Sequence, residues 1–171
     1  MRMFIGSPAR MIPEIEPIMA SISNIQNLRV VGINNFHLTY LFLGETNPKE
    51  TDRIVMELNK ISCKKFSAKI SGIKALPNIH HPRVIVILLE SPYLDQLYNR
   101  ISLLLSEYAN NEKKFLPHIT IARVRNGNPI PDISRLPIGE GMLPIDELCL
   151  FKSILTREGS IYERFWCNEF Y

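Results

Sequence analysis

Histidine and threonine recur at the same spacing in two apolar segments that lie far apart in the chain. His37 and Thr39 belong to FHLTYLFLGE, and His118 and Thr120 belong to PHITIARVR. Side chains two residues apart on a β-strand point to the same face, so each segment presents an imidazole beside a hydroxyl. One such tripeptide alone is uninformative, but two copies in a chain with four histidines favour a shared chemical role.

Two imidazoles and two hydroxyls around one cleft suit a phosphate group. The ordinary imidazole pKa of about 6.5 allows one histidine to be neutral and the other protonated near neutral pH. One would take a proton from an attacking oxygen, and the other would give a proton to the leaving oxygen. Threonine hydroxyls would donate hydrogen bonds to the non-bridging oxygens as negative charge develops. This division of roles needs no metal ion.

A mononuclear metal site is the competing use of the same two histidines, with His80 or His81 as a further ligand. The one acidic residue at a suitable spacing from either tripeptide is Glu45, which lies beyond a glycine turn. Hydrolytic metal sites with few histidines usually add carboxylates, so we favour the metal-free interpretation. His80 and His81 precede Pro82 in an expected loop, where surface or capping positions are more common.

Two arginines follow the second tripeptide. Arg123 and Arg125 carry the guanidinium fork that binds phosphate well. In a regular strand starting at His118, both point to the face opposite the imidazole. They would reach a phosphate only if the strand twists, bulges or ends near Ala122. We expect Arg125 to be a solvated strand end, and the pattern alone leaves Arg123 open between the two faces.

Aromatic residues near the first tripeptide are candidate platforms for nucleobase stacking. Phe4, Phe36 and Tyr40 all occupy expected strand positions, where aromatic rings can bind single-stranded nucleic acid. Aromatic residues in strands are more often part of the core. We keep Phe4 and Tyr40 as candidate substrate-binding residues.

The composition is that of one compact domain, with 171 residues of which 46% are hydrophobic and 22% charged. A formal net charge of +3 suits an anionic partner such as RNA without requiring one. The first apolar run is too short for a signal peptide, and no segment approaches the ~18 apolar residues of a membrane span, so we expect a cytoplasmic location. Cys63, Cys149 and Cys167 lie far apart without a C-x-x-C pair, and we expect them to be reduced and mostly buried.

Hydrophobic periodicity predicts the elements that must position these side chains. Strands are expected at 3–6, 36–44, 66–73, 80–90, 118–124, 146–155 and 160–170, and helices at 11–25, 47–61 and 91–108. Pro17 weakens the first helix, whereas Asn47, Pro48 and Glu50 form a capping box at the start of the second. Residues 126–144 are expected to form a loop. Each half then contains a strand, a helix and a His-x-Thr strand, which makes an internal duplication about a pseudo-twofold axis a candidate.

These segments resemble a known family. FHLTYLFLGE and PHITIARVR, with RMFIG, PRVIVILLE and LFKSIL…GSIYERF in the same order, resemble the two-histidine phosphoesterases, and among them RNA 2',3'-cyclic phosphodiesterase, also called 2'-5' RNA ligase. The resemblance covers nearly the whole chain. It implies an α+β, bilobal fold with two pseudo-symmetric lobes in one domain over residues 1–171. Each lobe would have a small antiparallel sheet and flanking helices, with the motif strands facing a central groove.

The resemblance also implies an activity and a role for each site residue. RNA 2',3'-cyclic phosphodiester ends would be hydrolysed to 2'-phosphomonoesters without a cofactor, and reversible 2'-5' RNA ligation, with a 5'-hydroxyl in place of water, would be a second reaction. His37 would give a proton to the departing 3'-oxygen, and His118 would accept one from the attacking water. Thr39 and Thr120 would hold phosphate oxygens, and Arg123 would contact the phosphate. The expected partner is RNA with cyclic phosphate ends or related nucleotides, with no membrane and no obligate protein partner, so the chain would act as a monomer.

A non-catalytic module that holds RNA ends or nucleotides in the same groove is the alternative from a different functional class. Binding alone could use any hydrogen-bond donors, which makes paired histidines less expected there. Another small phosphodiester as the substrate is a third interpretation within the family. Product formation from a 2',3'-cyclic nucleotide distinguishes the enzyme from the binding module.

Overall fold

A computed structural model describes residues 1–109, 113–125 and 129–171. Its strands are β1 (Arg2–Pro8), β2 (Leu28–Val30), β3 (His37–Glu45), β4 (Phe66–Leu76), β5 (Val84–Glu90), β6 (His118–Val124), β7 (Met142–Ile145), β8 (Glu147–Thr156) and β9 (Gly159–Glu169). Its helices are α1 (Glu16–Ser23), α2 (Pro48–Leu58) and α3 (Pro92–Leu104), and short 3-10 turns occupy Ile33–Asn35 and Ile133–Arg135.

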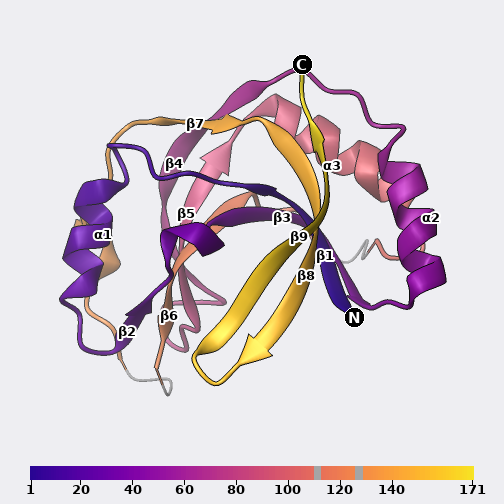
Figure 1. Cartoon of the computed structure of the whole chain (residues 1–171). Helices are drawn as coiled ribbons and strands as arrows, with labels where there is room; N and C mark the ends of the chain where they lie inside the picture. The colour runs from indigo at the N-terminus through magenta and orange to yellow at the C-terminus, as the bar shows by residue number, and fades with distance from the viewer. Residues whose placement is uncertain (110–112, 126–128) are drawn as a thin grey trace.

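The strands of the described residues form one curled antiparallel sheet. Its order is β7-β4-β5-β6-β3-β1-β8-β9, with β2 paired to β6. Figure 1 shows the helices on the outside of this sheet, with α1 on one flank beside β2 and with α2 and α3 together on the other flank. Helices on the outer flanks leave the opposite, concave side of the sheet available for a site. The α+β fold expected from the sequence is therefore confirmed.

The two halves of the sheet meet at the motif strands. On one side lie β6, β5, β4 and β7, and on the other lie β3, β1, β8 and β9. The halves are joined where Leu38 of β3 pairs with Ile119 of β6. The separate small sheets expected for two lobes are thus continuous, because pairing β3 with β6 removes two open strand edges.

Local sequence signals explain where the helices begin. The Asn47 side chain accepts a hydrogen bond from the Glu50 N–H, and the Glu50 carboxylate accepts one from the Asn47 N–H, so the capping box of α2 is confirmed. Ser91 caps α3 by accepting from the Tyr93 N–H. Helix α1 is shorter than the 11–25 predicted, because Pro17 favours the first turn of a helix and sets its start.

Two strands were missed by the sequence pattern. β2 has three residues and β7 has four, and the first three residues of β7 belong to the stretch 126–144 that was expected to be a loop. Such short strands carry no periodicity of their own and form because β6 and β4 offer them backbone partners. Residues 126–128 of the expected loop lie outside the described residues.

The expectation of three reduced cysteines was wrong. Cys149 and Cys167 form a disulfide across β8 and β9, and only Cys63 of the described cysteines carries a free thiol. The two strands form an antiparallel hairpin in which Cys149 and Cys167 lie directly opposite each other. A one-residue register shift beside Leu150 creates this match, and that shift is not visible as a spacing in the sequence.

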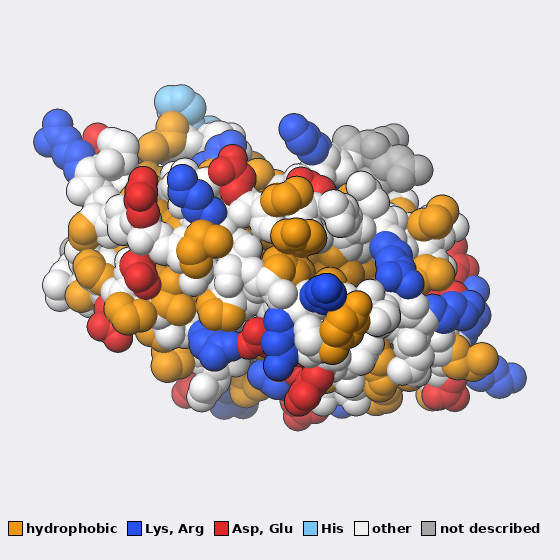
Figure 2. Space-filling view, turned by 90° about the horizontal axis from the view of Figure 1, so that it is seen from above, with side chains coloured by type: hydrophobic (Ala, Val, Ile, Leu, Met, Phe, Trp, Pro, Cys, Tyr) orange, Lys and Arg blue, Asp and Glu red, His pale blue; other side chains and the backbone are white. Residues whose placement is uncertain are grey.

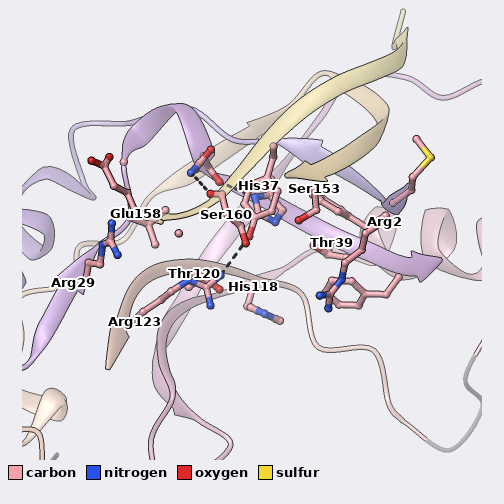
Figure 3. Close-up of a pocket in the computed structure, with 18 of the residues that line it drawn as sticks. Arg2, Arg29, His37, Thr39, His118, Thr120, Arg123, Ser153, Glu158 and Ser160 are labelled. Carbon is pink, nitrogen blue, oxygen red and sulfur yellow. Dashed lines mark hydrogen bonds between the residues drawn. The ribbon is translucent and has the colours of Figure 1, made fainter. Parts of the chain in front are cut away.

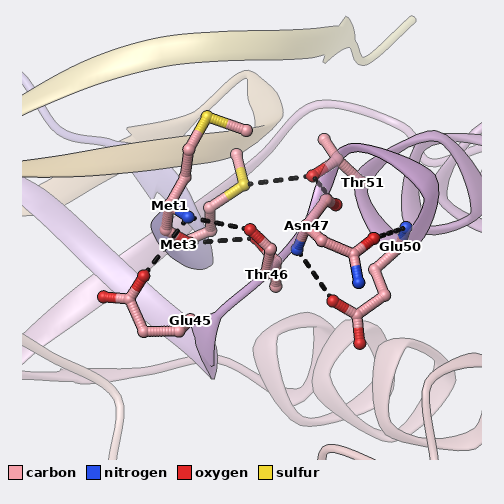
Figure 4. Close-up of polar contacts among 7 residues, drawn as sticks. All are labelled: Met1, Met3, Glu45, Thr46, Asn47, Glu50 and Thr51. Atoms are coloured by element: carbon pink, nitrogen blue, oxygen red, sulfur yellow. Dashed lines mark hydrogen bonds and ion pairs between the residues drawn. The ribbon is translucent and has the colours of Figure 1, made fainter.

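Polar contacts tie the end of β3 to the start of β1 (Figure 4). The Met1 amino group donates to the Thr46 carbonyl at 2.8 Å and lies 3.2 Å from the Glu45 carboxylate. The Thr46 hydroxyl donates to the Met1 carbonyl at 3.0 Å. These contacts continue directly into the Asn47 capping box, so one end of the first motif strand is held between β1 and α2.

The outer surface is chemically mixed. Figure 2 shows basic, acidic and apolar side chains interspersed on the face seen from above, without a field of one sign. The small positive net charge is therefore not spread as a patch over this face, and its local distribution matters more. Within residues 1–109, 113–125 and 129–171, no helix is long and apolar enough to cross a membrane.

Candidate active site

One cleft on the concave side of the sheet collects the side chains of both tripeptides. Its volume is about 570 Å³, and His37, Thr39, His118 and Thr120 all line it. In Figure 3, Arg2 and Arg29 lie at opposite ends of the cleft with these four residues between them. The structure thus brings together the two imidazoles and two hydroxyls that the spacing predicted.

The seam between β3 and β6 explains this convergence. Leu38 and Ile119 form an antiparallel pair and are both fully buried beneath the sheet. Each stands between the histidine and the threonine of its tripeptide, so strand alternation turns all four polar side chains to the other face. Continuing the register by one residue places His37 opposite Thr120 and Thr39 opposite His118.

Both imidazoles are held in the same way. Nδ1 of His37 lies 2.7 Å from the Asn35 carbonyl, and Nδ1 of His118 lies 2.6 Å from the Leu116 carbonyl. A carbonyl can only accept, so each Nδ1 carries the proton and donates it. Nε2 is then the free position on each ring. The two histidines therefore present equivalent nitrogens that can exchange a proton with a ligand.

His37 is enclosed by aromatic rings. The ring centroid of Phe4 lies 4.9 Å from that of His37, and Tyr162 approaches it edge-on at 4.6 Å. Burial among these rings lowers the pKa of His37 below 6.5, and the nearby positive charges of His118 and Arg123 lower it further. The hydrogen bond to the Asn35 carbonyl opposes the decrease. These surroundings thus favour the neutral form of His37.

We expect an anion in the cleft to reverse this effect. Inorganic phosphate beside His37 would stabilise the imidazolium and raise its pKa, because opposite charge favours the charged form. An NMR titration of the ring protons should give a His37 pKa below 6.5 in the free protein and a higher value with saturating phosphate. A phosphate-induced decrease would contradict the proposed position of the anion.

Arg123 reaches the cleft because β6 bulges. Thr120 pairs with Val86 of β5, but the next pair joins Ala122 to Ile85, which leaves Ile121 as an extra residue. Ile121 and Ala122 are both buried, and the alternation resumes with Arg123 on the cleft side. The strand therefore bulges next to Ala122, which was one of the conditions under which Arg123 could reach the face of the histidines. The Arg123 guanidinium donates to the Tyr162 hydroxyl at 3.3 Å.

Arg125 does not line the cleft. Its backbone N–H donates to the Asn27 carbonyl, and its side chain is exposed at the end of β6. Arg125 is thus a solvated residue at the end of a strand, as the sequence analysis expected.

The candidate aromatic platforms are mostly buried. Tyr40 is only 4% exposed and does not line the cleft. Its hydroxyl lies 2.9 Å from the Ser7 hydroxyl, which itself donates to the Glu147 carbonyl, so Tyr40 must be the donor. Phe36 is buried in the core, and Phe4 lines the cleft but is 3% exposed and packs against Phe151. Phe4 supports His37, and Tyr40 is a core residue that cannot contact a ligand in this cleft.

Sequence reasoning missed several residues of the cleft. Arg2 and Arg29 add two cations, and Glu158 is the one acidic residue among the described residues of the lining. Tyr162 contacts both His37 and Arg123, although it comes from β9 at the far end of the chain. Isolated arginines and a tyrosine carry no spacing signal, so only the folded chain shows that they belong to this site.

Among the residues that the structure describes, no group of three possible metal ligands includes either motif histidine. His80 and His81 lie in an exposed turn, where their backbone N–H groups donate to the Asn78 side chain. The one group of three possible ligands found within the described parts of the chain is Glu147, Cys149 and Cys167. Its two sulfurs are joined to each other and offer no thiolate. Neither arrangement assembles the metal site considered from the sequence.

Comparison of the fold with solved structures identifies its class. The protein TT0787 of Thermus thermophilus superposes with a TM-score of 0.80 at 23% identity, covering 99% of this chain and 97% of its own. E. coli LigT in complex with 3'-AMP gives 0.78 at 21% identity, covering 99% and 97%. The family model described as LigT like Phosphoesterase matches residues 5–86. The sheet with its paired motifs is thus the fold of a LigT-like phosphoesterase.

Curated relatives identify the family more closely. The RNA 2',3'-cyclic phosphodiesterase of Archaeoglobus fulgidus is 32% identical over 155 residues, which cover 88% of each chain. The protein of the same name from Methanocaldococcus jannaschii is 30% identical over 145 residues, covering 81% of this chain and 83% of its own. The chain belongs to the RNA 2',3'-cyclic phosphodiesterase family.

Proposed function

We propose that this enzyme hydrolyses 2',3'-cyclic phosphodiester ends of RNA to 2'-phosphomonoesters, with His37 and His118 as the paired acid and base. The observation that carries the proposal is the convergence of both His-x-Thr tripeptides on one cleft with equivalent free Nε2 atoms. Arg123 and the cations at the two ends of the cleft suit an anionic substrate. The relatives of the same family carry the matching name.

The chemistry follows from the positions of the two imidazoles. Water attacks phosphorus and gives its proton to Nε2 of His118, which acts as the general base. The bond between phosphorus and the 3'-oxygen breaks, and Nε2 of His37 gives that oxygen its proton. Thr39 and Thr120 donate to the non-bridging oxygens, and Arg123 balances the growing negative charge. His118 gains one proton and His37 loses one, and the products are a 3'-hydroxyl and a 2'-phosphate.

The acid role of His37 requires a bound anion. Burial in the cleft lowers the pKa of His37, and the phosphodiester supplies the negative charge that favours the protonated ring. The same groups would carry out a parallel step when a 5'-hydroxyl replaces water, and this step would form a 2'-5' linkage. His118 would again accept the proton of the attacking oxygen and His37 would again protonate the departing 3'-oxygen. Cleavage of the 2'-5' linkage is the reverse of this step, and there the acid and base roles of the two histidines exchange.

The test is a product analysis. Purified protein is incubated in EDTA with a short RNA that ends in a 2',3'-cyclic phosphate, and the position of the remaining phosphate is determined. We expect a 2'-phosphate at a rate that EDTA does not change, because no step of the proposed reaction uses a metal. A 3'-phosphate would refute the assignment of the leaving oxygen, and a rate abolished by EDTA would refute the metal-free mechanism. Tight RNA binding without turnover would support the binding module instead.

A further inference from the structure

We propose that Arg29 forms a second anion site, which binds the backbone phosphate that precedes the reacting cyclic phosphate of an RNA strand. This inference rests on the proposed function and deepens it, because it makes RNA chains rather than single nucleotides the preferred substrate class. Arg29 and its neighbour Arg123 are both exposed, and both line the cleft.

The pairing of β2 with β6 sets the distance between the two anion sites. Arg29 of β2 lies directly opposite Arg123 of β6. On the other side of β6, Thr120 pairs with Val86 of β5, and Arg123 pairs with Val84, two residues further along. At ~3.3 Å per residue, Thr120 and Arg123 are about 7 Å apart along the strands. This separation is comparable to that of neighbouring phosphates in a nucleotide chain.

Two guanidinium groups face each other across β2 and β6 without a counter-charge. Neither Arg29 nor Arg123 forms an ion pair with a carboxylate of the residues that the structure describes, although Glu158 lies at the same end of the cleft (Figure 3). Like charges directly opposite on neighbouring strands destabilise a sheet. A phosphate beside them would remove the repulsion, and guanidinium is the side-chain group that matches phosphate in geometry.

The β8–β9 turn packs against one side of the Arg29 guanidinium. A Cβ atom placed on Gly159 would lie 3.9 Å from Nη1 of Arg29 and 4.0 Å from both Cζ and Nη2. Nearly equal distances to these three atoms mean that the guanidinium turns its flat face to the turn. Its N–H groups lie around the edge of that plane and stay available to an anion. The Asn35 side chain holds the turn in place by donating to the Ser160 carbonyl at 3.1 Å.

The chemistry of the substrate indicates which anion this site would take. The four motif side chains bind the cyclic phosphate in the middle of the cleft, and Arg29 lies at one end of it (Figure 3). A cyclic mononucleotide carries no other negative charge. An RNA strand carries its next charge on the phosphodiester attached to the 5'-oxygen of the terminal ribose. Arg29 would therefore distinguish a strand from a mononucleotide.

The experiment compares two substrates that differ by one backbone phosphate. Adenosine 2',3'-cyclic phosphate has the cyclic group alone, and the dinucleotide ApA with a 2',3'-cyclic phosphate end has one further linkage. We expect the unaltered protein to have the higher kcat/KM for the dinucleotide. Arg29→Ala should lower the ratio of the two kcat/KM values by about 10-fold or more, the contribution of a hydrogen bond to a charged group. Arg29→Lys keeps the charge without the fork and should give an intermediate ratio.

Arg125→Ala is the matched control. It removes the same charge from the same end of β6, but from an exposed side chain that does not line the cleft, so it should leave the ratio unchanged. Added salt should weaken the dinucleotide preference of the unaltered protein more than that of Arg29→Ala, because a phosphate contact releases counterions. Equal losses in Arg29→Ala and Arg125→Ala would show a general attraction by surface charge and would overturn the site.

The remaining outcomes separate this inference from the proposed function. An unchanged ratio in Arg29→Ala would overturn the second site while leaving the hydrolase intact. A loss confined to ligation of adenosine 2',3'-cyclic phosphate to 5'-hydroxyl ApA would place the incoming strand at Arg29 and overturn its assignment to the preceding linkage.

If the unaltered protein turned over neither substrate, the proposed function would fall, and calorimetric titration would decide about Arg29. The two probes are 2'-AMP and the dinucleotide ApA with a 2'-phosphate end. Weaker binding of the dinucleotide alone by Arg29→Ala would support the site, and unchanged binding of both would refute it.

Discussion

We expect His118→Ala to lower kcat for a 2',3'-cyclic nucleotide by roughly 10²–10⁴-fold, with His37→Ala causing a loss of the same order. Each substitution removes the only free imidazole nitrogen on its side of the cleft. Water or a threonine hydroxyl is a poor replacement, because neither has a pKa near neutrality. Steady-state kinetics at neutral pH, with KM and kcat determined separately, measures the effect.

A matched histidine provides the control for this prediction. His80 lies in an exposed turn between β4 and β5 and does not line the cleft, so His80→Ala should keep full activity. The double variant of His37 and His118 should be little worse than either single variant, because the two rings act as a unit. Near-normal turnover in both single variants would contradict paired acid and base catalysis.

The second large effect is expected on stability. A Cβ atom added to Gly6 would lie 2.4 Å from the backbone carbonyl oxygen of Leu38, closer than any real contact allows. Backbone in a paired strand cannot rotate away as a flexible side chain can, so β1 and β3 must separate locally. We expect Gly6→Ala to lower the free energy of unfolding by about 1–3 kcal/mol or more, measured by urea denaturation. Activity should also fall, because Leu38 stands between His37 and Thr39.

Gly72 offers the comparison for Gly6→Ala. It lies within β4, and an added Cβ would meet only the Leu88 side chain at 3.9 Å, an ordinary contact. Gly72→Ala should therefore be neutral or slightly stabilising, because alanine has less conformational freedom to lose on folding. Equal destabilisation by both substitutions would show that the close approach of Gly6 to β3 is not the cause.

Regular patterns in the sequence predicted the parts of the fold that follow regular geometry. The capping box at Asn47, the apolar face of α3 and the shared face of His37 and Thr39 all depend on residues a few positions apart. The pairing of the two tripeptides was predictable because repetition itself is a pattern. These signals were sufficient for the α+β fold and for the four polar side chains that converge on the cleft.

Single extra residues in the strands account for most of what the sequence could not show. A bulge reverses the face of every later side chain, so Arg123 and Phe42 enter the cleft against their parity. A similar shift in the β8–β9 hairpin sets Cys149 opposite Cys167. The backbone partners decide where such bulges form, and those partners come from distant parts of the chain. The matching bulges of β3 and β6 also support the proposed internal duplication.

The matching bulges of β3 and β6 place different side chains beyond the two motifs, and this difference bears on which way round a substrate can bind. The motif histidines and threonines are nearly interchangeable under the local twofold relation, so by themselves they could accept a phosphodiester in either orientation. The side chains five residues after each histidine break that equivalence, since Arg123 lines the cleft from β6 and Phe42 lines it from β3. A substrate with an apolar flat end and an anionic end would then have a single productive orientation in the cleft. We therefore expect the residues that flank the motifs to decide which imidazole serves as the acid.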